Sequence, residues 1–330
     1  MSFKHLSLPE RHYIELETKN GTSKNKIAKN LKRNQGTISR EIQRNTGKKG
    51  YRYKQAQSFS KERLKTKNKA IKLTKEITIL IDKYIREEWS PEQIAGRLKK
   101  DKKITIHHET IYKYILKDKK NDGDLYTHLR HQNKTYRKRY GHPRNRSGIP
   151  NRVDIEKRPK VVESRKRVGD WEFDTIIGKN HKGAIVTMDE RKSKLRLAYP
   201  LPSKKGWPVI EAMIKLLNPI KEFVLTATFD NGKEFTHHEA FAKELDCDTY
   251  FAKPYHSWER GQNENANGLL RQYFPKNVEL DNVTEKEVYH AVDKLNSRPR
   301  KILSYLTPYE AFEKFTGINI KNLQGYAFMT

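Results

Sequence analysis

Three acidic residues occupy alternate positions of one short segment of the chain. Residues 167–178 alternate in the manner of a β-strand, and Asp170, Glu172 and Asp174 share one face of it. The opposite face is formed by Trp171, Phe173, Thr175 and Ile177. Because like charges this close repel one another, the arrangement is unfavourable unless some carboxylates are solvated or a cation lies nearby. The pattern therefore indicates a metal site and does not choose which of the three acids is the ligand.

A fourth acidic residue follows a segment that predicts a short buried strand. Residues 224–229 end at the turn sequence Asp230-Asn-Gly232, which would hold the Asp230 carboxylate at the carboxyl end of the strand. A ligand-facing position there is plausible, although a strand that ends in this way is more often followed by a plain turn. The segments before it predict antiparallel strands over residues 184–190 and 195–201 and a helix over residues 208–217.

Residues 262–274 predict a helix with polar residues along one face. Glu264, Asn267 or Gly268, and Arg271 recur at intervals of three to four residues. The apolar residues Leu269, Leu270 and Phe274 can pack elsewhere. An exposed Glu and Arg two turns apart are usually surface residues, so the helix taken alone does not indicate catalysis.

The positive charge of the chain lies almost entirely in its first half. The net charge is +29; residues 1–168 hold 46 Lys and Arg against 18 Asp and Glu, and residues 169–330 hold 23 against 22. A merely soluble surface would mix the signs, whereas a one-sided excess is typical of proteins that neutralise the phosphates of DNA. We therefore expect double-stranded DNA as a partner and a domain boundary near Val168.

The N-terminal segment carries the start signals of three successive helices. Ser7 and Glu10 have the spacing of a capping box, Ser23 precedes an apolar stripe, and Asn34 can cap a further helix. This order predicts a helix-turn-helix, whose last helix lies in the major groove. The residues that this helix would offer to DNA are Gln35, Thr37, Ser39, Arg40, Gln43 and Arg44. A small helical bundle with a solvated basic face is the alternative.

An internal repeat favours the DNA-binding interpretation. Residues 27–32 return as residues 94–99, and residues 37–42 return in type as residues 110–115. The second copy begins with its own capping box at Ser90. We therefore predict a second helix-turn-helix unit. It has six more residues between its repeated halves, which predicts a looser turn and a less certain DNA contact.

Two Lys- and Arg-rich segments, residues 61–75 and 128–168, are expected to be tethers, although the second could follow the phosphate backbone of DNA. The predicted domains are residues 1–60 and 61–127 for the two helix-turn-helix units, 128–168 for a basic linker and 169–330 for an α/β domain. The candidate DNA contacts outside the first unit are Lys113, Arg137, Lys138, Arg139 and Asn267.

Taken together, these features resemble a known family. The chain has an Asp in a strand, then Asp-Asn-Gly at the end of another strand, then a Glu in a helix. This order is similar to that of DDE transposases and integrases, and the local sequence motifs resemble those of the bacterial insertion sequence thirty family. The similar segments are residues 36–42, 169–178, 230–235, 254–261, 263–265, 268–275 and 296–301. The 33 residues between Asp230 and Glu264 match the spacing of that family. The chain departs from its usual wording at Asp170, where His is expected, and at Phe229, where a small hydroxyl residue is more usual.

The resemblance implies a fold, a function and a set of site residues. The fold would be an all-α half followed by an α/β ribonuclease H-like domain with a mixed five-stranded sheet. The function would be that of a transposase that binds the terminal inverted repeats of an insertion sequence. Asp174, Asp230 and Glu264 match the three catalytic acids and metal ligands. Arg271 matches the basic residue of the catalytic set two turns after Glu264, and it would contact terminal DNA or a phosphate. Asp189 resembles a structural acid of related domains and is the alternative ligand.

Three carboxylates suffice to hold two metal ions about 3.5–4 Å apart, which can serve both ends of an in-line phosphodiester displacement. Mg²⁺ prefers oxygen ligands and keeps several waters, so Mg²⁺ (or Mn²⁺) is the expected cofactor, with two ions. We predict that Asp174 bridges the ions and that Asp230 and Glu264 each hold one. Water would first release a 3′ end, whose hydroxyl would then attack a second phosphodiester. Because two DNA ends must be held together, a homodimer or higher oligomer is expected.

Composition excludes several other classes of protein. No run of 18 apolar residues is present, the first 20 residues lack the apolar stretch of a signal peptide, and the single Cys247 excludes an intramolecular disulfide framework. These features predict a cytoplasmic protein, associated with the nucleoid when bound to DNA. Two rival functions stay open: a DNA-binding regulator with an inactive C-terminal half, and a plain ribonuclease H-like nuclease.

Overall fold

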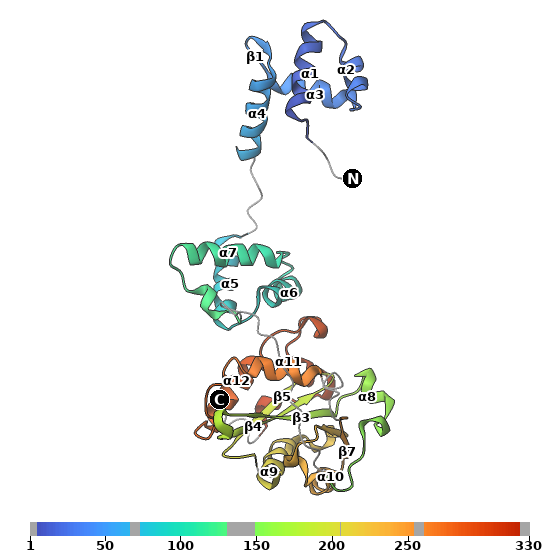
Figure 1. The fold of residues 1–330 in the computed structure, drawn as a ribbon, viewed down its shortest axis with the longest axis vertical. Coiled ribbons are helices and arrows are strands. Elements are labelled where there is room, and N and C mark those ends of the chain that lie inside the picture. Colours follow the sequence, from blue (N-terminus) through green and yellow to red (C-terminus); the bar gives the residue numbers. More distant parts are fainter. Residues whose placement is uncertain (1–4, 67–72, 131–148, 205, 254–260, 324–330) are drawn as a thin grey trace. The chain divides into compact units, whose positions relative to one another are not determined.

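The computed structural model describes residues 5–66, 73–130, 149–204, 206–253 and 261–323. The chain forms two compact units, Met1–Lys72 and Leu73–Thr330. Figure 1 shows helices in the first unit and, in the second, a further group of helices followed by a domain with a central sheet. This order confirms the predicted fold class, an all-α N-terminal half followed by an α/β domain.

The helix starts of the first unit form as the sequence predicts. Ser7 caps the first helix and forms a capping box with Glu10, while Ser23 and Asn34 cap the next two. The elements are α1 (Leu8–Lys19), α2 (Lys24–Asn30), α3 (Gln35–Asn45), the short strands β1 (Thr46–Gly47) and β2 (Gly50–Tyr51), and α4 (Tyr53–Thr66). Their common core consists of Leu6, Ile14, Ile27, Ala28, Ile38, Tyr51 and Ala56.

The last helix of this unit extends past the boundary predicted at residue 60. Helix α4 continues to Thr66, and Arg11 of α1, which is buried, donates a hydrogen bond to Ser60 at 3.2 Å. Because such contacts join α4 to the first helix, the tether predicted for residues 61–75 begins inside a helix. Residues 67–72 of that tether lie outside the described part of the chain.

Three further helices repeat this arrangement around a core of their own. The elements are α5 (Lys75–Arg86), α6 (Pro91–Lys102), α7 (His108–Lys120) and the 3₁₀ helix η1 (Leu125–His128). Ser90 caps α6 with the predicted capping box. Ile94 and Ile111 are fully buried, as are Ile27 and Ile38 at the corresponding positions of the first unit. The sequence repeat is therefore a repeat of the buried positions.

The looser turn predicted for the second copy is not present. The turn between α2 and α3 covers residues 31–34, and that between α6 and α7 covers residues 103–107. Helix α2 has 7 residues whereas α6 has 12. The additional residues therefore lengthen the first helix of the pair and leave the turn almost unchanged, because they continue the helix up to a left-handed Lys103.

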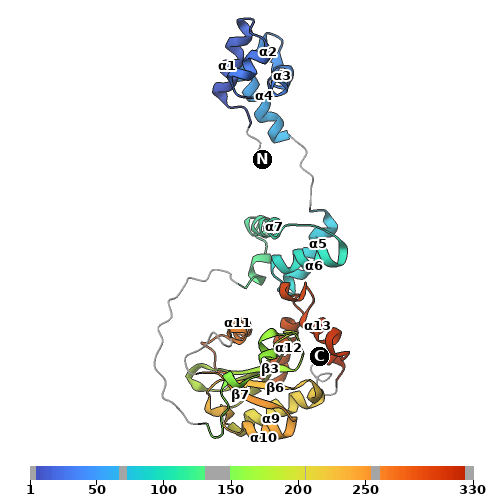
Figure 2. The ribbon, with the colours of Figure 1, turned by 90° about the vertical axis from the view of Figure 1, so that its right-hand side faces the viewer.

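The second unit contains the mixed five-stranded sheet that the resemblance implies, in the order β5-β4-β3-β6-β7. Strands β3, β4 and β5 are antiparallel neighbours, and β6 and β7 run parallel to β3. The strands are β3 (Asp170–Ile177), β4 (Ala184–Glu190), β5 (Arg196–Leu201), β6 (Thr226–Phe229) and β7 (Asp248–Phe251). The α-helices are α8 (Lys160–Ser164), α9 (Gly206–Leu217), α10 (His238–Leu245), α11 (Gly261–Leu270), α12 (Glu285–Asn296) and α13 (Pro308–Thr316). Figures 1 and 2 show α9 and α10 on one face of the sheet and α11 and α12 on the other.

Short 3₁₀ helices connect these elements. They are η2 (Ile155–Lys157), η3 (Lys179–His181), η4 (Asn218–Phe223), η5 (Lys233–Phe235), η7 (Lys301–Leu303) and η8 (Ile320–Asn322). Among the strands, β3 and β4 are those that α11 contacts most.

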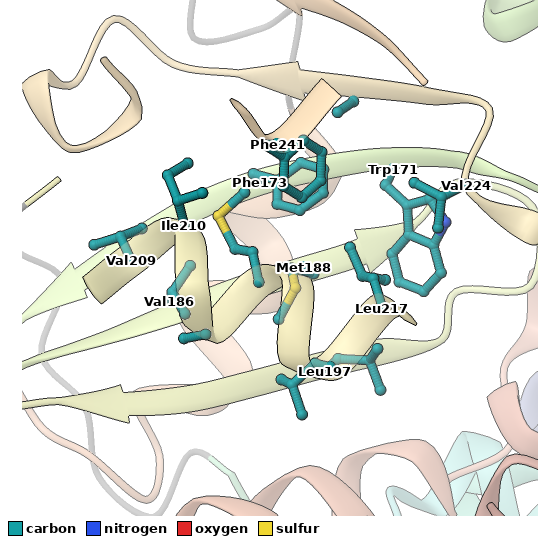
Figure 3. Close-up of a cluster of buried hydrophobic side chains, with 14 of the residues drawn as sticks. Trp171, Phe173, Val186, Met188, Leu197, Val209, Ile210, Leu217, Val224 and Phe241 are labelled. Carbon is teal, nitrogen blue, oxygen red and sulfur yellow. The ribbon is translucent and has the colours of Figure 1, made fainter. Parts of the chain in front are cut away.

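Both faces of the sheet are covered by apolar cores. Figure 3 shows Trp171 and Phe173 of β3 with Met188 of β4 in the larger core, beneath α9 and α10. Phe229 is fully buried there, with its ring centroid 4.9 Å from that of Phe173. The residue that departs from the family wording at this position is therefore a core residue. A smaller core lies under α11 and α12 on the opposite face.

Part of the predicted basic linker belongs to this α/β domain. Residues 131–148 lie outside the described residues, but Val162 of α8 is fully buried and Asp154 forms a parallel bridge with Phe251 of β7. The domain therefore begins earlier than the predicted residue 169.

Hydrogen bonds join α6 to the C-terminal segment of the same unit. Arg97 donates to both carboxylate oxygens of Glu310 at 2.6 Å. A Cβ atom on Gly96 would lie 2.0 Å from the ring of Tyr305, so this close approach requires glycine. The second helix-turn-helix unit is therefore attached to the domain that carries the sheet.

Acidification should weaken this attachment. The hydrogen bonds from Arg97 lower the pKa of Glu310 from 4.5 to about 2. A carboxylate whose pKa falls on folding contributes stability above its ordinary pKa and loses it as the pH falls toward the folded value. Glu310→Gln should therefore lower the unfolding temperature at neutral pH, and its difference from the parent chain should shrink between pH 4.5 and 2. Calorimetry at several pH values measures this difference, and a constant difference would contradict the prediction.

Candidate active site

Two of the three acidic residues on β3 are buried and paired with arginine. Asp170 has no exposed surface and accepts hydrogen bonds from Arg167 at 2.9 Å and from the Thr226 hydroxyl at 2.8 Å. Glu172 is 1% exposed and pairs with Arg191. Arginines of the chain itself therefore offset the negative charge of these two acids, so that neither needs a metal ion nearby.

Asp174 is the acid of the three that keeps part of its surface exposed. Its Oδ1 accepts a hydrogen bond from the Thr175 backbone at 3.0 Å, and its Oδ2 accepts one from Asn267 Nδ2 at 2.7 Å. The sequence left the three acids equivalent on one strand face. Burial now separates them, because only Asp174 is accessible to a ligand from solvent.

Asp174 and Asp230 both follow the paired stretch of two neighbouring strands. The parallel pairing of β3 with β6 ends where Glu172 lies beside Thr228, and each aspartate lies two residues beyond that last pair. Asp230 comes directly after β6, which ends at Phe229. The turn that follows β6 orients the Asp230 carboxylate, since the Gly232 backbone donates to its Oδ1 at 2.9 Å.

Asn267 connects α11 to the strand that carries Asp174. While its amide nitrogen donates to Asp174, its Oδ1 accepts hydrogen bonds from Thr187 of β4 at 3.2 Å and from Arg196 of β5 at 2.9 Å. Both ends of the amide are thus engaged within the protein. The DNA contact predicted for Asn267 stays a prediction, and the structure shows a different contact, with a carboxylate of the candidate site.

Glu264 lies on an exposed flank of α11. It follows Asn263, which is 1% exposed, and consecutive residues of a helix point about 100° apart. Among the described residues, no group of three or more His, Cys, Asp or Glu side chains could hold a metal ion. In the described part of the chain, Glu264 is therefore not gathered with Asp174 and Asp230 into one three-carboxylate cluster.

Comparison with known proteins identifies the family. Residues 2–45 match the model of a helix-turn-helix domain. Over 318 residues the chain is 42% identical to the transposase for insertion sequence element IS4351 of Bacteroides fragilis. This alignment covers 96% of the chain and 98% of that protein. The chain belongs to the insertion sequence thirty (IS30) family of transposases. It is also 33% identical to transposase InsI for element IS30A of Escherichia coli K12, over 94% of the chain and 84% of that protein.

A solved structure also matches part of this IS30-family transposase. The catalytic core domain of BIV integrase is 25% identical to it, covering 44% of the chain and 95% of that domain, with a TM-score of 0.36. None of the described helices of the transposase is long and apolar enough to cross a membrane.

Asp189 of the transposase is a partner in a buried ion pair. Its side chain is 3% exposed, and both its oxygens accept hydrogen bonds from Arg196, at 2.8 and 2.6 Å. These bonds argue against its role as the alternative metal ligand. The sequence analysis missed Arg196, although an Arg opposite an Asp across the predicted hairpin was a usable signal, since the two residues are direct cross-strand neighbours.

Arg271 hydrogen-bonds to the backbone at the end of β3. It lies just past α11, which ends at Leu270 rather than continuing to residue 274 as predicted. Its guanidinium donates to the carbonyl oxygens of Ile177 at 2.9 Å and Phe274 at 3.3 Å, and burial lowers its pKa. The DNA contact predicted for Arg271 stays a prediction, and DNA would compete with these hydrogen bonds.

The candidate DNA contacts of the first unit lie on the outer side of α3. Gln35, Arg40, Gln43 and Arg44 are exposed, and Thr37 and Ser39 are half-buried. Thr37, Arg40 and Arg44 line a hollow of about 570 Å³ together with residues of α4. Lys113 of α7 is exposed, while Arg137, Lys138 and Arg139 lie outside the described residues. The helix-turn-helix match favours DNA binding over a plain basic bundle for this unit.

Proposed function

We propose that this transposase binds the terminal inverted repeats of its insertion sequence and catalyses metal-dependent DNA cleavage and strand transfer at Asp174, Asp230 and Glu264. The observation that carries the proposal is that Asp174 and Asp230, both partly exposed, each lie two residues beyond the last pair of the neighbouring parallel strands β3 and β6. Helix α11, which bears Glu264, contacts Asp174 through Asn267.

The chemical nature of these residues fits a hard cation. Carboxylate oxygens are the ligands that Mg²⁺ prefers, and Mn²⁺ accepts the same donors. Asp174 and Asp230 would hold the metal, and Glu264 must approach them for all three to act on one site. Two bound ions would supply charge relief at the attacking and leaving oxygens of a phosphodiester.

The basic half of the chain would bind the DNA and bring it to the carboxylates. The half of the chain that carries the carboxylates is nearly neutral, with 23 Lys and Arg against 22 Asp and Glu, so we propose that the basic half supplies most of the affinity for DNA. The exposed side chains of α3 would contact the terminal repeats in the major groove. Because two ends must be joined, a homodimer or higher oligomer would assemble on the DNA.

The proposal is tested by incubating the full chain with a duplex that carries an end of its own element. With Mg²⁺ we expect cleavage at the element end and joining of the released 3′ end to a second duplex, and with EDTA neither product. Cleavage without joining would favour a plain nuclease. Binding without cleavage at any Mg²⁺ or Mn²⁺ concentration would favour a regulator with an inactive C-terminal half. Either of these outcomes would overturn the proposal.

Asn267→Ala should weaken the metal site without unfolding the domain. Groups that orient metal-ligating carboxylates typically contribute about 10- to 100-fold in metal affinity or activity. We therefore expect the Mg²⁺ concentration for half-maximal cleavage to rise by roughly that factor, since Asp174 would lose the donor that orients it. Asn282→Ala, an exposed residue of the same domain, is the matched control and should titrate like the parent chain.

A further inference from the structure

A basic hollow lies on the flank of α11 that faces away from Glu264. It has a volume of about 390 Å³ and is lined by Asn265, Ala266 and Leu269 of α11. The other lining residues come from β4, β5 and the turn between them, from the end of α12 and the segment after it, and from the residue after α8. On a helix with 3.6 residues per turn, these three positions lie on a different flank from Glu264. The hollow is therefore separate from the candidate active site and belongs to the same helix.

Four cationic side chains line this hollow, Arg165, Lys194, Arg196 and Arg300. The one carboxylate among the lining residues, Asp189, already accepts two hydrogen bonds from Arg196. The hollow therefore has a surplus of positive charge that its own acidic residue does not offset.

Backbone carbonyls hold two of these cations in place. Lys194 donates to the carbonyl of Arg191, and Arg300 donates to that of Leu295 at 2.8 Å. Burial and the neighbouring Arg165 lower the pKa of Lys194 to about 8. Burial and the neighbouring Arg298 lower the pKa of Arg300 to about 10. A lowered pKa means that the surroundings disfavour the charged form of each side chain. A bound anion would favour the charged form and so offset this effect.

We propose that this hollow is a subsite for a backbone phosphate of the DNA strand that passes the catalytic carboxylates. The inference rests on the proposed function and names a second place at which the same domain holds its substrate. An α-helix is about 10 Å across, roughly three base-pair steps of 3.4 Å, so a strand that reaches Glu264 can also reach the far flank of α11. The exposed Ile302 at the hollow, 69% exposed, offers an apolar surface to the sugar beside that phosphate.

Two of the segments that lie outside the described residues carry no acidic side chain that could occupy the hollow. Residues 131–148, which lie outside the described part, contain six Lys and Arg and no Asp or Glu. Residues 324–330 contain no charged side chain. A polyanion from outside the chain therefore suits the hollow better than these segments do.

Disulfide trapping tests the proposal on the full chain. Lys194→Cys and Arg165→Cys would be incubated separately, without Mg²⁺, with element-end duplexes that carry a thiol tether at successive phosphates around the cleaved bond. The natural Cys247 is a poor competitor, because burial raises the pKa of its thiol to about 12. Lys243→Cys on α10, an exposed lysine on the opposite face of the sheet, is the matched control.

We expect both variants to form disulfides with one or two adjacent phosphates and the control to form none. Lys194→Gln should also reduce the slope of the logarithm of the DNA-binding constant against the logarithm of salt concentration by about 0.9, the value for one phosphate contact. The inference would be overturned if the disulfide yield of both variants were no higher than that of the control, or if it were equal at all phosphate positions. Because trapping requires no turnover, a chain that traps DNA here but does not cleave it once Mg²⁺ is added would refute the proposed function and leave the phosphate subsite standing.

Discussion

Asp174→Asn should remove DNA cleavage and joining while leaving the fold intact. Loss of a single electrostatic group at a reacting centre costs about 100- to 1000-fold in rate, and loss of a metal-binding carboxylate should cost at least that much. Asp174 is partly exposed and Asn keeps an oxygen that can accept the Asn267 hydrogen bond, so the unfolding temperature should change by less than about 2 °C. Glu264→Gln should behave in the same way.

Glu172→Gln is the matched control on the same strand and should have the opposite effect. Glu172 is 1% exposed and pairs with Arg191, so its neutralisation leaves a buried guanidinium with less compensation. Removing one partner of a buried ion pair costs about 3–5 kcal/mol, and we expect the lower end because Glu163 also contacts Arg191. Cleavage measured at equal concentrations of folded protein should be retained. If Glu172→Gln abolished cleavage at unchanged stability and Asp174→Asn did not, Glu172 would be the first catalytic acid.

Arg196→Met should be among the most destabilising single changes in the α/β domain. Arg196 and Asp189 are 4% and 3% exposed, and the arginine also donates to Ala266 of α11 at 2.7 Å. Its removal would leave a buried carboxylate without its cation, at a cost of about 3–5 kcal/mol. For a domain of this size we expect the unfolding temperature to fall by roughly 6–20 °C in calorimetry.

Two comparisons separate the buried ion pair from a general loss of charge. Lys182→Met breaks an exposed pair with Glu279 and should leave the unfolding temperature nearly unchanged, because solvent screens such a pair. The double variant Asp189→Leu with Arg196→Met removes both charges and should regain at least half of the lost stability, because no buried charge is left uncompensated. A double variant no more stable than Arg196→Met would show that the charge pair is not the cause.

Local chemistry made much of the helical half predictable. Ser7, Ser23, Asn34 and Ser90 cap helices because their side chains accept amide hydrogen bonds within three residues, an interaction that depends on neighbours in sequence alone. The internal repeat was visible for a related reason, since apolar residues four apart in each half of the repeat build each small core. The length of α6 was not predicted, because nothing in the repeat says whether inserted residues continue a helix or widen a turn.

Some features of the candidate site were also predictable from neighbouring residues, whereas others depend on contacts between residues far apart in the sequence. The three acidic residues on one strand face, the turn at Asp230 and the helix that carries Glu264 follow from the sequence, since each depends on a few neighbouring residues. Which acid of β3 is accessible was decided by partners distant in sequence: Thr226 lies 56 residues from Asp170, and Arg191 lies 19 residues from Glu172. The local pattern was therefore enough to predict that acidic residues would gather on β3. That Asp174 is the accessible one of the three depends on the burial and the contacts that the fold creates for Asp170 and Glu172. Such contacts join residues far apart in the chain, and no local pattern of residues records them.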